Sequence, residues 1–151
     1  MANRNIWIVG GYIRDSLLCK ITKDIDFVTD GNTKKFAREF ADKTNGSFVV
    51  LDDFNKIYRV VIGEEIYDFS KMQGKNISED LSRRDFTINS MALKADGRCQ
   101  MADWSKNLID TFDGLSDIKI KIVRAVSERN FIDDPLRLLR AYRFAGQLNF
   151  S

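Results

Sequence analysis

Apolar residues cluster in short runs along the first half of the chain, as they do in a small sheet flanked by helices. Runs rich in β-branched and aromatic residues predict strands at 6–9, 25–28, 48–51, 58–62 and 66–69, the last two joined as a hairpin. Helical spacing of apolar residues predicts helices over 12–18 and 33–44, the second with Thr33 as its N-cap and Gly46 as its stop.

The middle of the chain is less regular. A polar stretch runs from Ser70 to Ser78, and the spacing of Ile88, Met91 and Leu93 then predicts a helix. We therefore expect an α+β fold, in which a small mixed sheet with helices is followed by a more helical region.

The last third of the chain ends in a predicted helix. Residues 108–114 are expected to be irregular and residues 122–126 to form a short strand. Pro135 suits the first position of a helix that Asp134 caps. The chain stops soon after this helix, with nothing to bury its apolar positions, so we expect a fragment of a longer protein.

The composition narrows the possible chemistry. A chain of 151 residues with 44% hydrophobic and 30% charged residues is typical of one globular domain. It contains no histidine, which excludes a Ser-His-Asp triad, a Cys-His pair and imidazole-bound zinc. The net charge of +2 neither requires nor excludes a polyanionic partner.

The two cysteines indicate the redox state of the cellular compartment. Cys19 and Cys99 are far apart in sequence and form no CxxC pair, so we expect reduced thiols and a cytoplasmic protein. No apolar run approaches the roughly 18 residues of a membrane span, and the first residues do not resemble a signal peptide. We therefore expect no membrane partner.

Two acidic residues on one predicted strand are candidate metal ligands. Asp24 and Asp26 are two positions apart, so both carboxylates project to one face of the strand. Two neighbouring carboxylates repel each other unless a cation relieves them, and oxygen ligands of this kind suit Mg²⁺. The alternative is a pair of solvated charges at a strand end.

A glycine turn precedes this strand. Gly10 and Gly11 lie between a predicted strand and a predicted helix, where backbone N–H groups can approach a phosphate. Arg14 could bind the same phosphate, with Asp15 orienting it. The alternative is a tight turn beside a surface Arg-Asp pair, and neither the P-loop pattern nor G-x-G-x-x-G is present.

Two further segments combine arginines with carboxylates. Residues 83–89 could hold a triphosphate and a ribose hydroxyl, or could be a charged helix start. Asp134 and Arg137 are neighbours on one helix face and could match the edge of a base, or could be a surface salt bridge.

These segments, in order, resemble the head and early neck domains of class II tRNA nucleotidyltransferases. This family comprises the CCA-adding enzymes and their poly(A) polymerase relatives, in the polymerase-β superfamily. The matching segments are GGYIRD at 10–15, DIDFV at 24–28, RRDFTINSMA at 83–92 and DDPLRLLR at 133–140. Asp133 is a departure, because the base-reading motif of the family usually begins with Glu.

The resemblance implies a domain division and a set of site residues. It implies a polymerase-β-like nucleotidyltransferase head over 1–115 and the start of a helical neck over 116–151, without the body and tail domains. The implied site residues are Asp24 and Asp26 for the catalytic metals, Gly10, Gly11 and Arg14 for the triphosphate, Arg83, Arg84, Asp85 and Asn89 for ribose and phosphates, and Asp134, Arg137 and Arg140 for the nucleotide, with the first two reading its base. Asp68 is a candidate third carboxylate, or a surface acid of the hairpin.

The resemblance also implies an activity. It implies an enzyme that transfers C from CTP, or both C and A from CTP and ATP, to the 3′ end of tRNA with the help of two Mg²⁺ ions. The alternatives are a poly(A) polymerase and a non-catalytic RNA- or nucleotide-binding module on a transferase head. A binding module has no need of two repelling carboxylates, which favours the enzyme.

One segment predicts which bases are added. In CCA-adding relatives, the connection that corresponds to Ser70–Ser78 is a longer flexible loop, associated with the switch from CTP to ATP. The segment here is too short for such a loop, so we expect a CC-adding enzyme that needs a separate A-adding partner.

Overall fold

The computed structural model describes residues 5–95 and 104–151. Its elements are β1 (Ile6–Val9), α1 (Gly11–Leu17), β2 (Asp24–Thr29), α2 (Thr33–Thr44), β3 (Ser47–Asp52), β4 (Ile57–Ile62), β5 (Glu65–Lys71), α3 (Ile77–Ser82), the 3-10 helix η1 (Thr87–Asn89), β6 (Ala92–Lys94), α4 (Trp104–Asn107), β7 (Leu108–Ile109), α5 (Gly114–Ile120), α6 (Arg129–Asp133) and α7 (Arg137–Leu148). Cys99 lies outside the described residues, and Cys19 is an exposed free thiol. In the part of the chain that the structure describes, no helix has the length and apolar character to span a bilayer.

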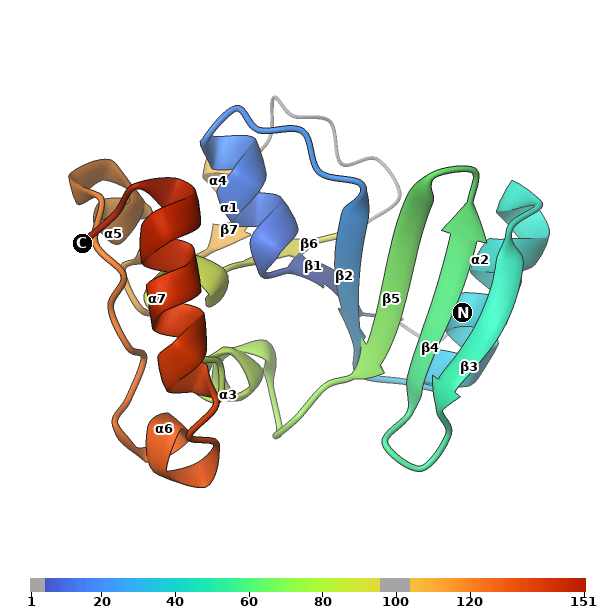
Figure 1. Ribbon diagram of the computed structural model, residues 1–151. Coiled ribbons are helices and arrows are strands. Elements are labelled where there is room, and N and C mark those ends of the chain that lie inside the picture. Colours follow the sequence, from blue (N-terminus) through green and yellow to red (C-terminus); the bar gives the residue numbers. More distant parts are fainter. Residues whose placement is uncertain (1–4, 96–103) are drawn as a thin grey trace.

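The strands form one mixed sheet in the order β3-β4-β5-β2-β1-β6-β7 (Figure 1). Among the strands of the described residues, β2 and β5 are parallel, with Asp26 opposite Asp68, and the other neighbours are antiparallel. The five predicted strands and the expected α+β class are confirmed. A crossover through α2 and the β3–β4 hairpin makes the β2–β5 pairing possible, because parallel neighbours cannot be joined by a tight turn.

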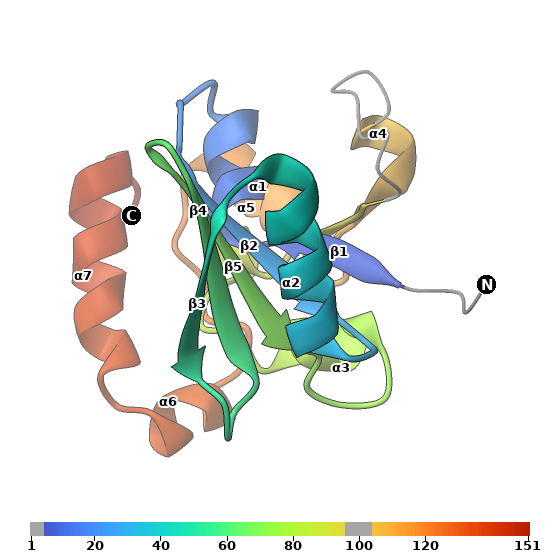
Figure 2. The ribbon, with the colours of Figure 1, turned by 90° about the vertical axis from the view of Figure 1, so that its right-hand side faces the viewer.

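Helices cover the two faces of this sheet. Figure 2 shows α2 on one side and α7 on the other. One apolar cluster joins α2 to the sheet through Ala37, Ala41, Tyr58 and Phe69. A second cluster joins α1, η1, α5 and α7; its buried members include Ile13, Phe86, Ile88, Met91, Ile118 and Phe144.

The caps of α2 differ by one residue from the prediction. Asn32, not Thr33, is the N-cap, and its side chain accepts a hydrogen bond from the Lys35 N–H at 3.0 Å. The helix ends at Thr44, and Asn45 takes the left-handed conformation before Gly46.

The predicted helix through Ile88, Met91 and Leu93 is wrong. The structure has η1 there, followed by β6, whose Leu93 pairs with Ile8 of β1. Every residue from 85 to 93 is buried. Burial on all sides removes the polar face on which a periodicity argument depends, so spacing alone could not separate strand from helix.

Other short elements were also missed. Helix α3 begins at the end of the polar stretch, and α6 precedes α7. In the expected irregular passage at 108–114, β7 and the start of α5 take up the two ends, and residues 110–113 are irregular as predicted. The predicted strand at 122–126 is wrong, because only Ala125 forms an isolated bridge, to Phe86. Helix α7 begins at Arg137, two residues after Pro135, and Asp134 instead accepts the Leu136 N–H at 3.2 Å.

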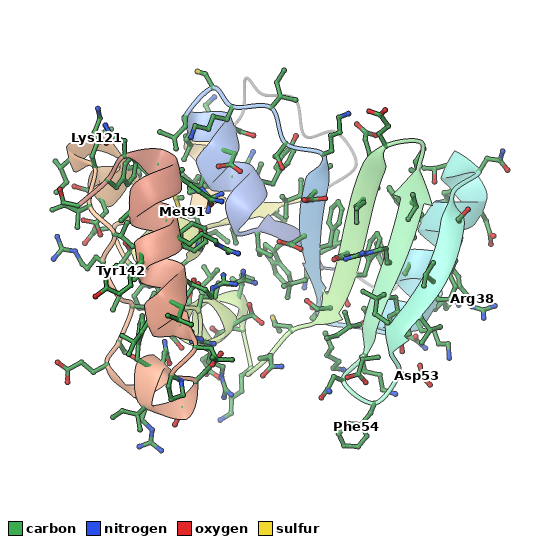
Figure 3. The ribbon with its side chains drawn as sticks, in the orientation of Figure 1. Arg38, Asp53, Phe54, Met91, Lys121 and Tyr142 are labelled. Atoms are coloured by element: carbon green, nitrogen blue, oxygen red, sulfur yellow. The ribbon has the colours of Figure 1, made fainter. Side chains whose placement is uncertain are left out.

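The expectation that nothing buries the apolar positions of α7 holds for its outer face only, because Phe144 is buried and Ala141 and Leu148 pack against the same cluster. Leu136, Leu139 and Tyr142 are 70%, 67% and 81% exposed. Figure 3 shows Tyr142 on the outer side of α7, away from Met91, which is fully buried under the helix.

Candidate active site

The β2 carboxylates open into a cavity between the sheet and α7. Asp24 and Asp26 both line a hollow of about 250 Å³, so the prediction that they share a face is confirmed. The other predicted site residues on its wall are Gly10, Gly11, Arg14, Arg84, Asp85, Asn89 and Arg140.

Gly10 brings three segments together. It has φ 73° and ψ −134°, a backbone conformation that only glycine adopts readily. A Cβ placed there would lie 3.2 Å from Nη1 of Arg84 and 3.7 Å from Oδ2 of Asp26. The absence of a side chain therefore lets the arginine and the carboxylate approach the same turn.

The pKa of Asp26 is shifted by its surroundings. Although its side chain is open to the cavity, desolvation by the protein around it raises the pKa of Asp26. The Arg84 charge opposes this rise in pKa, while Asp68 and Asp24 add to it. A cation at this position would relieve the repulsion between the carboxylates.

A hydrogen-bond chain joins α1, η1 and α7. Arg14 donates to both oxygens of Asp15 at 2.8 and 2.9 Å, as predicted, and to Asn89 Oδ1 at 2.7 Å. Asn89 donates to Asp85 Oδ1 at 3.2 Å, and Arg140 donates to Asp85 Oδ2 at 2.7 Å. Arg14 and Asp85 are only 8% and 6% exposed, so this chain fixes two cavity arginines in place.

Arg84 is held less completely. Its Nη2 donates to Asp80 Oδ2 at 3.3 Å. Its Nε is buried and has no hydrogen-bond partner among the described residues. An unpaired buried donor is costly, and an anionic ligand in the cavity would offer an acceptor.

The base-reading candidates lie outside the cavity wall. Arg137 donates to the Arg83 carbonyl at 2.8 Å and lies 3.5 Å from Asp134, at the junction of α6 and α7. Asp134 and Arg137 are therefore neighbours, as predicted, but neither they nor Arg83 line the hollow. Asp133 pairs with Arg129 on the exposed side of α6.

Asp68 has a cation partner of its own. Both of its oxygens accept from Arg59, at 2.7 and 2.8 Å, and it is not on the cavity wall. Its use as a third ligand stays a prediction. Within residues 5–95 and 104–151, no cluster of three or more acidic, Cys or His side chains is close enough to hold a metal.

Sequence reasoning missed four residues of the cavity wall: Tyr12, Thr22, Arg143 and Phe144. The guanidinium carbons of Arg14, Arg140 and Arg143 lie 5.0, 5.4 and 5.0 Å from the centroid of the Phe144 ring. The position of Arg143 one turn after Arg140 on a helix was the available signal.

A larger hollow of about 480 Å³ lies elsewhere, beside the start of α2. Lys34, Lys56 and Lys71 line it, but its one carboxylate, Asp53, is paired with Lys34. It lacks the facing acidic and basic groups of the smaller hollow, so we place the candidate active site at Asp24 and Asp26.

Curated relatives are tRNA nucleotidyltransferases. The chain is 40% identical to a CC-adding tRNA nucleotidyltransferase of Geobacter sulfurreducens, over 96% of this chain and 32% of the relative. It is 39% identical to an A-adding tRNA nucleotidyltransferase of Aquifex aeolicus, over 96% and 19%. It is 35% identical to a CCA-adding enzyme of Levilactobacillus brevis, over 99% and 39%. The chain thus spans at most about two fifths of these relatives.

Solved structures show the same fold. A tRNA-processing enzyme with CTP matches with a TM-score of 0.85 and 40% identity, over 97% of this chain and 39% of that one. A CCA-adding enzyme with ATP matches with a TM-score of 0.86 and 34% identity, over 99% and 36%. The profile of the poly A polymerase head domain matches residues 6–77 and 69–124, and the chain belongs to this family, with the polymerase-β-like head that the motifs indicated.

Proposed function

We propose that this chain is the nucleotidyltransferase head of an enzyme that adds cytidine to the 3′ end of tRNA. The observation that carries this proposal is the cavity in which Asp24 and Asp26 face four arginines: Arg14, Arg84, Arg140 and Arg143. The carboxylates suit a cation, and the arginines suit a polyphosphate. The relatives named above favour tRNA as the acceptor over the poly(A) and non-catalytic alternatives.

The charge balance of the cavity supports nucleotide binding. Arg14, Arg84 and Arg140 each have a carboxylate partner, Asp15, Asp80 and Asp85 in that order. Among the described residues, Asp24, Asp26 and Arg143 have no ion-pair partner. These three groups can bind a metal or a nucleotide without giving up an ion pair, whereas the three paired arginines would bind a phosphate beside their carboxylates.

Mg²⁺ fits the oxygen donors of Asp24 and Asp26 and, when bound, would stabilise charge on the attacking and leaving oxygens. Around it, Gly10, Gly11 and Arg14 would bind the triphosphate. Asp85 and Asn89 would hold the arginines that surround it, because their side chains are already bonded to Arg140 and Arg14.

The reaction follows from this arrangement. The 3′-hydroxyl of the RNA gives up its proton to water as its oxygen forms a bond to the α-phosphorus of CTP. The bond from that phosphorus to the bridging oxygen breaks in line, and pyrophosphate leaves. Arg84 is placed to neutralise the phosphates. Asp134 and Arg137, at the junction of α6 and α7, would read the base.

Two finer statements belong to this proposal. The first is that residues 1–115 form the head and residues 116–151 the start of a neck, in a protein that binds tRNA in the cytoplasm. The second statement is cytidine-only addition, which rests on the short connection between β5, ending at Lys71, and α3, beginning at Ile77.

The proposal is tested by removing each carboxylate. Asp24→Ala and Asp26→Ala should abolish transfer from CTP to a tRNA that lacks its 3′ end, because each removes a metal ligand without deleting core volume. The control is Asp42→Ala, an exposed acid of α2 on the opposite face of the sheet, which should retain transfer. Transfer at the wild-type rate by either β2 variant would overturn the assignment.

A further inference from the structure

The connection between β5 and α3 is fastened to the first turn of α3 by two carboxylates. The Gln73 N–H donates to Asp80 Oδ1 and the Lys75 N–H donates to Glu79 Oε2, each at 2.8 Å. Between them, Gly74 has φ 103°, and a Cβ there would lie 2.7 Å from the Glu79 side chain. The path of the connection therefore depends on these two acids.

The two acids differ in what else they contact. Glu79 is half-buried, and among the described residues its carboxylate accepts hydrogen bonds only from groups of the connection, Lys75 and Asn76. Asp80 is 5% exposed, and its second oxygen accepts from Arg84 Nη2 at 3.3 Å. One buried carboxylate thus holds the connection with one oxygen and a cavity arginine with the other.

Arg84 is held less firmly by its neighbours than Arg14 is. Arg14 is fixed by three hydrogen bonds, whereas Arg84 has one side-chain bond, to Asp80, and a buried Nε with no partner among the described residues. Its Nη1 lies at the Gly10 turn that the Asp26 carboxylate also approaches, and its charge lowers the pKa of Asp26. A movement of Asp80 would shift a charge directly beside the metal-binding candidate.

We propose that Asp80 is a positioning residue that couples the conformation of residues 72–76 to the placement of the Arg84 guanidinium. The inference rests on the proposed function for its consequence, which is that a triphosphate bound at Arg84 and the connection affect each other. By linkage, the coupling is reciprocal: whatever fixes Arg84 stabilises the connection, and whatever moves the connection changes nucleotide binding.

A ligand-free experiment tests the coupling itself. Hydrogen exchange is measured at the Gln73 and Lys75 amides of the wild-type chain and of Arg84→Met. Loss of the Arg84 contact should speed exchange at Gln73 about fivefold, the effect of weakening one hydrogen bond, and leave Lys75 unchanged. The control is Arg83→Met, which removes the neighbouring exposed arginine and should change neither amide. Unchanged exchange at Gln73 in Arg84→Met would overturn the proposal.

A nucleotide experiment tests the consequence. CTP with Mg²⁺ should slow exchange at Gln73 in the wild-type chain and in Glu79→Gln. It should have no such effect in Asp80→Asn, which keeps an acceptor for the Gln73 N–H but loses the charge that holds Arg84. Far-UV circular dichroism and the thermal midpoint confirm that each variant is folded.

The two experiments separate the two ideas. An equal CTP effect in Asp80→Asn and wild type would overturn the coupling even though the nucleotide binds. If the wild-type chain bound no CTP in calorimetry, the proposed function would fail, and the ligand-free exchange would still decide whether Asp80 couples the two parts.

Discussion

At the scale of single residues, the first prediction concerns Gly10, whose turn depends on the absence of a Cβ. Gly10→Ala would put a Cβ into a glycine-only conformation and 3.2 Å from Arg84 Nη1. We expect a loss of about 1–3 kcal/mol in the free energy of unfolding, together with weaker CTP binding because Arg84 must move. Urea unfolding and calorimetry measure the two effects.

The matched control is Gly31→Ala. Gly31 has no left-handed φ, and an added Cβ would meet nothing within 4 Å. This variant should keep both stability and CTP binding. Equal behaviour of the two alanine variants would show that the Gly10 turn is not constrained as described.

Asp117 gives a pH-dependent prediction at the same scale. Burial alone would raise its pKa, but hydrogen bonds from Arg124 and Thr87 outweigh burial and hold the pKa of Asp117 below its ordinary value. A carboxyl with a lowered folded pKa stabilises the protein above its unfolded pKa, and this stabilisation is lost as pH falls through the folded value. Asp117→Asn should therefore cost about 2 kcal/mol at pH 7, and the difference from wild type should shrink below about pH 4.

Denaturant unfolding between pH 3 and 7 measures this difference. Asp133→Asn is the control, because Asp133 and its partner Arg129 are 61% and 80% exposed at their side chains. A surface pair of this kind contributes about 0.5 kcal/mol or less. A difference between Asp117→Asn and wild type that stays constant down to pH 3 would contradict the stated cause.

At the scale of elements, α6 holds the arginine segment that follows α3. Asn130 is 9% exposed, and its Nδ2 donates to the Ser82 and Arg84 carbonyls, both at 2.8 Å. Asn130→Asp keeps the shape but replaces the donor with a carboxylate facing two carbonyl oxygens. We expect a loss of about 1–3 kcal/mol in unfolding free energy and a several-fold higher KM for CTP. Asn130→Gln, which keeps the donor, should recover part of the KM; no recovery would mean that Asn130 matters only for packing.

The hydrogen bonds of Asn130 also show what the sequence could and could not predict. Asp24 and Asp26 were predictable because strand periodicity alone places both on one face. Asn130 was not, because its partners are backbone carbonyls nearly fifty residues earlier, and no spacing rule reports such a contact. The same holds for β6, whose pairing with β1 is decided by tertiary contacts in a segment buried on every side.

At the scale of the whole molecule, α7 closes the cavity opposite the sheet. Arg140 bonds to Asp85, Arg137 bonds to the Arg83 carbonyl, and Phe144 is buried among three arginines. The start of the expected neck is thus part of the site. A nucleotide bound there would contact both parts, so base choice depends on how they are arranged together.

The last prediction concerns that base choice. In the structure, β5 ends at Lys71 and α3 begins at Ile77, and the residues between are fastened to α3 through Glu79 and Asp80. A short connection held in this way cannot remodel the cavity after two additions, so the pocket should keep its preference for cytosine.

The complete protein that contains this chain is given tRNAs that end before the CCA sequence or after CC, with CTP or ATP. We expect two additions from CTP on the first RNA, which also proves that the preparation is active, and none from ATP on the second. Efficient addition of a terminal A to the RNA ending in CC would return this chain to the CCA-adding class.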